Sequence, residues 1–177
     1  FIGNTTFAYS NILKRSAVLE SSLERDYYRW RVFFLNKGED FITQPEPIEH
    51  HFHGKPSRYT PDGALVVPDF VYKEEVKYFN VTLRAEFIEK VEYLTQLYMQ
   101  RNEVFRVLTE KDIRVGHRAD NIGQLFPCLH HPAPIEEFKT LTEGLENAGY
   151  TISQMVHLAS SKNLESIVVK RAIAHLS

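Results

Sequence analysis

The sequence has one cysteine, Cys128, among 177 residues, and it has no long apolar run. A single cysteine excludes an internal disulfide and a zinc site built from several thiolates, and it suits a reducing compartment. We interpret Cys128 as a core residue. No apolar run approaches the roughly 18–20 residues that a membrane span needs. We therefore expect a protein that does not enter a membrane.

The charges nearly balance, because the formal net charge is −2. Attraction to nucleic acid would therefore have to come from local basic groups or a bound cation. The chain is 43% hydrophobic and 12% aromatic, which is enough for one sizeable core plus a small appended domain. The first residue is Phe1 and no signal-peptide pattern follows, so we expect the sequence to begin inside a longer protein.

Hydrophobic spacing predicts the elements of the first two thirds of the chain. Apolar residues three and four apart over 16–36 indicate an amphipathic helix, capped by Ser16 or Ser21 and ended at Gly38. Further elements are extended segments at 41–45 and 48–53, a β-hairpin at 63–67 and 70–78, a helix at 83–102 and a strand at 103–109. This order predicts a mixed α/β sheet with helices on its faces.

The pattern changes at Gly116, after which β-branched runs stop and helical spacing takes over. Three helices are predicted, over 134–148, 151–160 and 163–176. We therefore expect an α/β domain over 1–115 and a small helical domain over 116–177. The last two helices could form a helix-turn-helix.

The predicted hairpin brings acidic residues together. Pro68-Asp69 is a turn signal, and if the chain turns there, facing residues have numbers that add up to 137. Asp62 then lies opposite Glu75, with Lys77 further along the face of Glu75. Two close carboxylates repel each other unless a cation lies between them, which favours a hard ion such as Mg²⁺. A lysine beside that ion can orient a water or stabilise charge on a phosphate.

Several motifs occur in an order and spacing that point to one family. They are the segments 20–28, 44–45, 59–62, 75–77, 107–114 and 121–125. With them the sequence resembles TnsA, the endonuclease subunit of bacterial heteromeric cut-and-paste transposases. The resemblance implies a restriction-endonuclease-like core with the PD-(D/E)xK pattern. It also implies an all-helical, winged-helix-like C-terminal domain that contacts DNA or the other transposition proteins.

The resemblance also implies a catalytic set of Glu24, Asp62, Glu75 and Lys77. Asp62, Glu75 and the carbonyl of Val76 would hold Mg²⁺, for which Mn²⁺ would substitute. Glu24 would help to bind or position a second ion or a water, and Lys77 would assist the attacking water.

Each acidic candidate also has an ordinary structural interpretation. Asp62 could be a turn or capping acid at the start of a strand. Glu24 could be a surface helix acid, and Glu20, one turn earlier, is its rival. Glu74 is the rival of Glu75, but the alternation of the strand places Glu74 on the buried side.

Basic residues precede the hairpin. Lys55 and Arg58 are candidates for phosphate contacts with DNA, and the alternative is a solvated loop. His51 and His53 share a strand face, but two histidines without a third ligand are a weak metal signal, so we interpret them as surface or substrate-facing residues.

The implied reaction is hydrolysis of one phosphodiester at the 5′ side of each transposon end, in the bacterial cytoplasm. A DDE-type transposase would cut and join the 3′ strands, and an AAA+ ATPase regulator would recruit both proteins. Relatives in CRISPR-associated transposons, which use RNA-guided targeting, share this layout. The alternatives are a catalytically silent DNA- or protein-binding adaptor with a nuclease fold, and a stand-alone restriction or repair nuclease.

Overall fold

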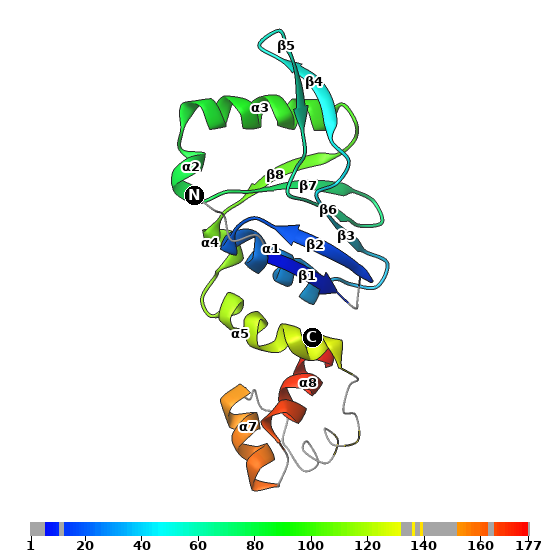
Figure 1. Cartoon of the computed structure of the whole chain (residues 1–177), viewed down its shortest axis with the longest axis vertical. Coiled ribbons are helices and arrows are strands. Elements are labelled where there is room, and N and C mark those ends of the chain that lie inside the picture. The colour runs from blue at the N-terminus through cyan, green and yellow to red at the C-terminus, as the bar shows by residue number, and fades with distance from the viewer. Residues whose placement is uncertain are drawn as a thin grey trace. The chain divides into compact units, whose positions relative to one another are not determined.

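The computed structural model describes residues 6–10, 13–131, 136, 139, 152–162 and 165–176. The chain divides into two compact units, Phe1–Ala119 and Asp120–Ser177 (Figure 1). The sequence pattern changes close to this boundary, at Gly116. Apart from Glu136 and Lys139, the helix predicted over 134–148 lies outside the described residues.

A four-stranded sheet forms the centre of the first unit, in the order β3-β6-β7-β8. Its strands are β3 (Asp40–Thr43), β6 (Gly63–Val66), β7 (Val71–Val76) and β8 (Val104–Leu108). The β3–β6 and β6–β7 pairs are antiparallel and the β7–β8 pair is parallel. Helices α2 (Phe79–Thr82) and α3 (Ala85–Met99) make the crossover that a parallel pair requires. The predicted mixed α/β sheet with flanking helices is confirmed.

The β6–β7 hairpin has the register expected from its turn signal. Gly63 pairs with Glu74 and Val66 pairs with Val71, so the facing numbers add up to 137. Two backbone hydrogen bonds between Val67 and Phe70, of 2.9 and 3.3 Å, close the turn around Pro68-Asp69. This register fixes which side chains of β7 share a face, because successive residues of a strand point to opposite faces.

Helix α1 (Ser22–Phe33) is shorter than the predicted 16–36. The predicted start was wrong because Arg15–Leu19 form β2, which pairs antiparallel with β1 (Thr6–Ser10). Leu19 stands four residues before Leu23, so it fits a helical stripe as well as the strand alternation in which it is buried. The helix is capped by Ser21, whose hydroxyl accepts a 3.1 Å hydrogen bond from the backbone N–H of Glu24. It ends at Phe33, before Gly38.

The two long helices of the first unit lie on opposite sides of the sheet (Figure 1). On the α1 side, Tyr27 meets Phe41 edge to face at 5.3 Å between ring centroids. On the α3 side, Leu94 and Tyr98 pack with Phe105 in a second buried cluster. Two apolar layers therefore enclose the central strand β7.

A second hairpin, β4 (Ile48–Phe52) with β5 (Lys55–Tyr59), forms a separate two-stranded sheet. The two strands are joined by a two-residue turn, with φ 52° at His53 and 72° at Gly54. Positive φ at both positions is the geometry of tight hairpin turns. Lys55 and Arg58 therefore lie on a strand, so the solvated loop given as the alternative for them was wrong.

The second unit is helical over its described residues. It contains most of α5 (Arg118–Leu125), the 3₁₀ helix η1 (Phe126–His130), α7 (Ile152–Ser161) and α8 (Ser166–Leu176). Helices α7 and α8 match two predicted helices and pack through Met155, Ala159 and Val169. Cys128 is buried, as expected. None of the described helices is long and apolar enough to cross a membrane.

Candidate active site

The end of β7 brings three of the four predicted catalytic residues together. The Lys77 ammonium lies 2.9 Å from Glu75 Oε1 and 3.6 Å from Asp62 Oδ2. The same nitrogen donates a 3.1 Å hydrogen bond to the carbonyl oxygen of Val76. Oxygens of three of the four predicted metal ligands, all except Glu24, therefore converge on the Lys77 ammonium.

Backbone contacts hold this arrangement in place. The N–H of Val76 donates a 2.7 Å hydrogen bond to Asp62 Oδ2, so the strand itself orients that carboxylate. The N–H of Lys77 donates to the carbonyl of Leu108 at 3.0 Å, at the end of the β7–β8 ladder. The N–H of Gln44 donates to the carbonyl of Asp62 at 3.1 Å. Asp62 and Lys77 are thus fixed by hydrogen bonds to neighbouring chain segments.

Tyr59 is a member of the site that we did not predict from the sequence. Its hydroxyl donates a 2.5 Å hydrogen bond to Glu75 Oε2. Burial and the negative charge of Glu75 raise the pKa of Tyr59, so the hydroxyl stays protonated and remains a donor. The signal available in the sequence was the proximity of Tyr59 to Asp62 in the Tyr-Thr-Pro-Asp motif.

The site holds more negative than positive charge. Burial, and next the charge of Glu75, raise the pKa of Asp62 from its ordinary value of 3.8 to about 6. Burial lowers the pKa of Lys77, but Asp62 and Glu75 outweigh it and raise the pKa overall, so the ammonium is charged at neutral pH. Two carboxylates and one ammonium leave an excess of one negative charge, which a divalent cation would reverse.

The donor set fits a hard divalent cation. Lys77 already places a positive group where the carboxylates of Asp62 and Glu75 and the carbonyl of Val76 converge. Among the described residues, no group of three or more His, Cys, Asp or Glu could hold a metal ion. An ion here would therefore take two carboxylates, the carbonyl and water, a set that suits Mg²⁺ because Mg²⁺ keeps several waters.

Glu24 has a structural role that we did not predict, although Ser21 and Glu24 have the spacing of a capping box. Its carboxylate accepts hydrogen bonds from the N–H of Glu20 at 2.9 Å and from the Ser21 hydroxyl at 2.8 Å. These bonds cap the start of α1. Glu24 also acts on the site through its charge, because it is the weakest of the causes that raise the pKa of Asp62.

Glu74 lies on the opposite face of β7, as its place in the strand predicts. It is fully buried, and it accepts hydrogen bonds from Tyr27 at 2.6 Å, Arg31 Nε at 2.8 Å and Arg106 Nε at 2.6 Å. Both arginines also form ion pairs with it. This carboxylate is saturated by protein groups, which removes it as a rival of Glu75 for a metal ion.

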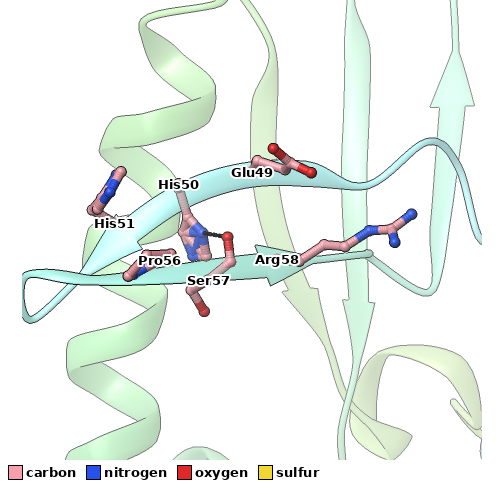
Figure 2. Close-up of a pocket in the computed structure, with 6 residues that line it drawn as sticks. All are labelled: Glu49, His50, His51, Pro56, Ser57 and Arg58. Carbon is pink, nitrogen blue, oxygen red and sulfur yellow. Dashed lines mark hydrogen bonds between the residues drawn. The ribbon is translucent and has the colours of Figure 1, made fainter.

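Lys55 and Arg58 lie on β5 and are exposed. Arg58 lines an open cavity of about 420 Å³ on the β4–β5 hairpin, with His50, His51 and Ser57 among the other residues (Figure 2). His53 lies at the hairpin turn and pairs with Glu89 at 3.2 Å. The structure thus places the two predicted DNA-contact residues on the hairpin that ends at Tyr59.

No protein-family model matches the chain, and no curated protein matches it. The interpretation of the site therefore depends on its geometry, its charge and the motifs of the sequence.

Proposed function

We propose that this protein is a metal-dependent DNA endonuclease of the TnsA type, which hydrolyses the 5′ strand at transposon ends during cut-and-paste transposition. The observation that carries the proposal is the convergence of Asp62, Glu75 and the Val76 carbonyl on the Lys77 ammonium. Two acids, a carbonyl and a lysine at the end of a strand provide cation ligands and a donor for a phosphate or a water.

A bound Mg²⁺ or Mn²⁺ ion would supply positive charge that polarises the phosphate under attack. The side chain of Lys77 is 37% exposed, so it can leave its carboxylate partners and donate a hydrogen bond to a phosphate oxygen or to the attacking water. When Lys77 leaves, the Val76 N–H still orients the Asp62 carboxylate, and the Tyr59 hydroxyl still orients the Glu75 carboxylate.

The remaining parts of the proposal rest on the motifs. Glu24 would position a second ion or a water through its charge. The helical second unit, with α7 and α8, would contact a DDE-type transposase, an AAA+ ATPase regulator or the DNA itself. A bacterial cytoplasmic protein, of a CRISPR-associated or another transposon, fits this assembly.

Strand-specific nicking of labelled transposon-end DNA, with Mg²⁺ and the partner transposase, tests the proposal. Asp62→Asn should reduce 5′-strand cleavage by at least about 100-fold, because the variant loses a metal ligand and keeps the shape of the side chain. The matched control is Asp69→Asn, which removes the same charge from the exposed turn of the same hairpin and should cleave like the wild type.

Other results would favour other functions. Absence of 5′ cleavage by the wild-type protein would contradict the proposal and leave the silent adaptor. Cleavage that needs neither the partner nor a transposon end would indicate a stand-alone nuclease.

A further inference from the structure

The β4–β5 hairpin is an arm that α3 holds by one face only. Ile48 and Tyr59, at the base of the hairpin, are buried in a cluster with Leu94 of α3. Further out, the Tyr93 hydroxyl donates a 2.8 Å hydrogen bond to the carbonyl of His51. The hairpin is not hydrogen-bonded into the four-stranded sheet (Figure 1). One of its faces therefore remains available to a partner.

The tip of the hairpin also contacts α3, through more exposed groups than the base. Phe52 meets Tyr93 at 5.1 Å between ring centroids, and His53 Nε2 lies 3.2 Å from Glu89 Oε1. The turn has positive φ at both His53 and Gly54, the geometry that matches the twist of the two strands. The arm is preorganised, so a partner that binds it does not have to order it.

The free strand β5 carries two cations that the protein does not neutralise. Within the described residues, neither the Lys55 side chain nor the Arg58 side chain has a hydrogen-bond or ion-pair partner. Glu49 faces Arg58 in the ladder, yet the two form no ion pair. Figure 2 shows the extended Arg58 side chain pointing away from His50 and His51.

Protection against strand pairing is the ordinary explanation for such residues. Lysine and proline on an edge strand prevent aggregation, which would account for Lys55 and Pro56. It does not account for Arg58, which lines the open cavity together with Ser57. By strand alternation Arg58 projects from the face turned away from α3 and Lys55 from the other face near the tip, so the two cations flank strand β5. Guanidinium and ammonium groups both bind phosphate oxygens.

The histidines of the hairpin have a different role. His50 Nδ1–H donates a 3.3 Å hydrogen bond to the carbonyl of Ser57, which ties the two strands together. Burial, with the charges of His51 and Lys90, lowers the pKa of His50, so it is neutral at pH 7. Lys55 and Arg58 carry the positive charge of strand β5, and Lys90 of α3 lies nearby, with its ammonium 4.6 Å from the centre of the Tyr59 ring.

Arg58 lies one residue from Tyr59 of the candidate active site along β5, although the two side chains project from opposite faces of the strand. The next residue in β5 is Tyr59, whose hydroxyl holds Glu75 Oε2 at 2.5 Å. Adjacent residues of a strand are only about 3.3 Å apart along it. We propose that the β4–β5 hairpin is a DNA-backbone clamp, in which Lys55 and Arg58 bind phosphates of the duplex that the site cleaves. The choice of DNA as the partner rests on the proposed function.

Binding of a fluorescent DNA duplex by the full chain, measured by anisotropy in EDTA over a range of salt concentrations, tests the clamp. Lys55→Gln/Arg58→Gln should weaken binding by about tenfold or more at low salt and should lower the salt slope by about 2, one unit for each lost phosphate contact. Both side chains are exposed, so the variant should unfold at the temperature of the wild type.

The matched control is Lys14→Gln/Lys37→Gln, which removes two exposed charges from other loops of the same unit. Wild-type affinity and salt slope in the control, with a loss in the hairpin variant, would support the clamp. Equal losses in both variants, no loss in the hairpin variant, or no DNA binding by the wild type would overturn it.

This experiment separates the clamp from the nuclease, because EDTA prevents metal-dependent cleavage. A hairpin-dependent affinity without any Mg²⁺-dependent nicking would support the clamp and contradict the nuclease. DNA nicking that depends on Asp62, together with an unchanged DNA affinity in the Lys55→Gln/Arg58→Gln variant, would contradict the clamp alone.

Discussion

Glu74 and Glu75 are neighbours in β7, but their surroundings are opposites. Glu74 has no exposed surface and is balanced by two guanidinium groups and a tyrosine hydroxyl. Glu75 shares its side of the strand with a second carboxylate and with one ammonium, so negative charge remains. The α1 face is thus arranged for stability, and the other face carries a charge excess that a ligand could relieve. Functional sites commonly cost stability in this way.

Of the substitutions that test this difference between the two faces, Glu74→Gln should reduce the stability of the protein most. The variant leaves the Arg31 and Arg106 charges without their buried partner, and we expect a loss of about 3–5 kcal/mol in the free energy of unfolding. Urea denaturation followed by circular dichroism measures it. The control is Glu103→Gln, which breaks the more exposed 3.1 Å pair with Lys73 and should cost about 1 kcal/mol or less. Equal losses in the two variants would contradict a special role for the Glu74 network.

Asp62→Asn should act in the opposite direction at pH 7. The fold raises the pKa of Asp62 from 3.8 to about 6, so it favours the protonated carboxyl. The stability that this group contributes is therefore fully present below pH 3.8 and is lost as the pH rises through 6. In EDTA we therefore expect the variant to be more stable than the wild type at pH 7, by about 1–3 kcal/mol, and to lose this advantage near pH 4.

Thermal and urea unfolding at the two pH values measure this difference. Asp69→Asn, in the exposed turn, should stay within about 0.5 kcal/mol of the wild type at both. A less stable Asp62→Asn at pH 7 would mean that the site is not over-charged.

Tyr59→Phe should have a smaller effect on stability and a clear effect on metal binding. The variant loses the hydrogen bond that orients Glu75, and we expect about 1 kcal/mol less stability and about 10-fold weaker binding of Mg²⁺. Tyr98→Phe is the control, because Tyr98 belongs to the same cluster and its buried hydroxyl has no hydrogen-bond partner among the described residues. Metal affinities that match in the two variants would show that Tyr59 does not position the ligand.

The sequence predicted the parts of the site that depend on local order. The β6–β7 register followed from the Pro68-Asp69 turn signal, and it set Glu74 and Glu75 on opposite faces. The predicted start of α1 was wrong because Leu19 fits both a helix and a strand, and the pairing of β2 with β1 places it in a strand.

Contacts between distant segments could not be predicted. The partners of Glu74 lie 43 residues earlier, at Arg31, and 32 residues later, at Arg106, so only the folded sheet brings them together. The same holds for Tyr59, whose bond to Glu75 depends on how the second hairpin packs on α3. For Glu24 the sequence offered a catalytic acid or a surface helix acid, and only the structure shows its hydrogen bonds to Glu20 and Ser21.

Calorimetric titration of the wild-type protein with Mn²⁺ and Mg²⁺ at pH 7 tests the central claim, that the Asp62 and Glu75 face of β7 is a cation site. Binding by the wild type and by Asp69→Asn, with loss of binding in Asp62→Asn and in Glu75→Gln, is the predicted result. No binding by the wild type, or binding that survives both substitutions, would contradict the claim.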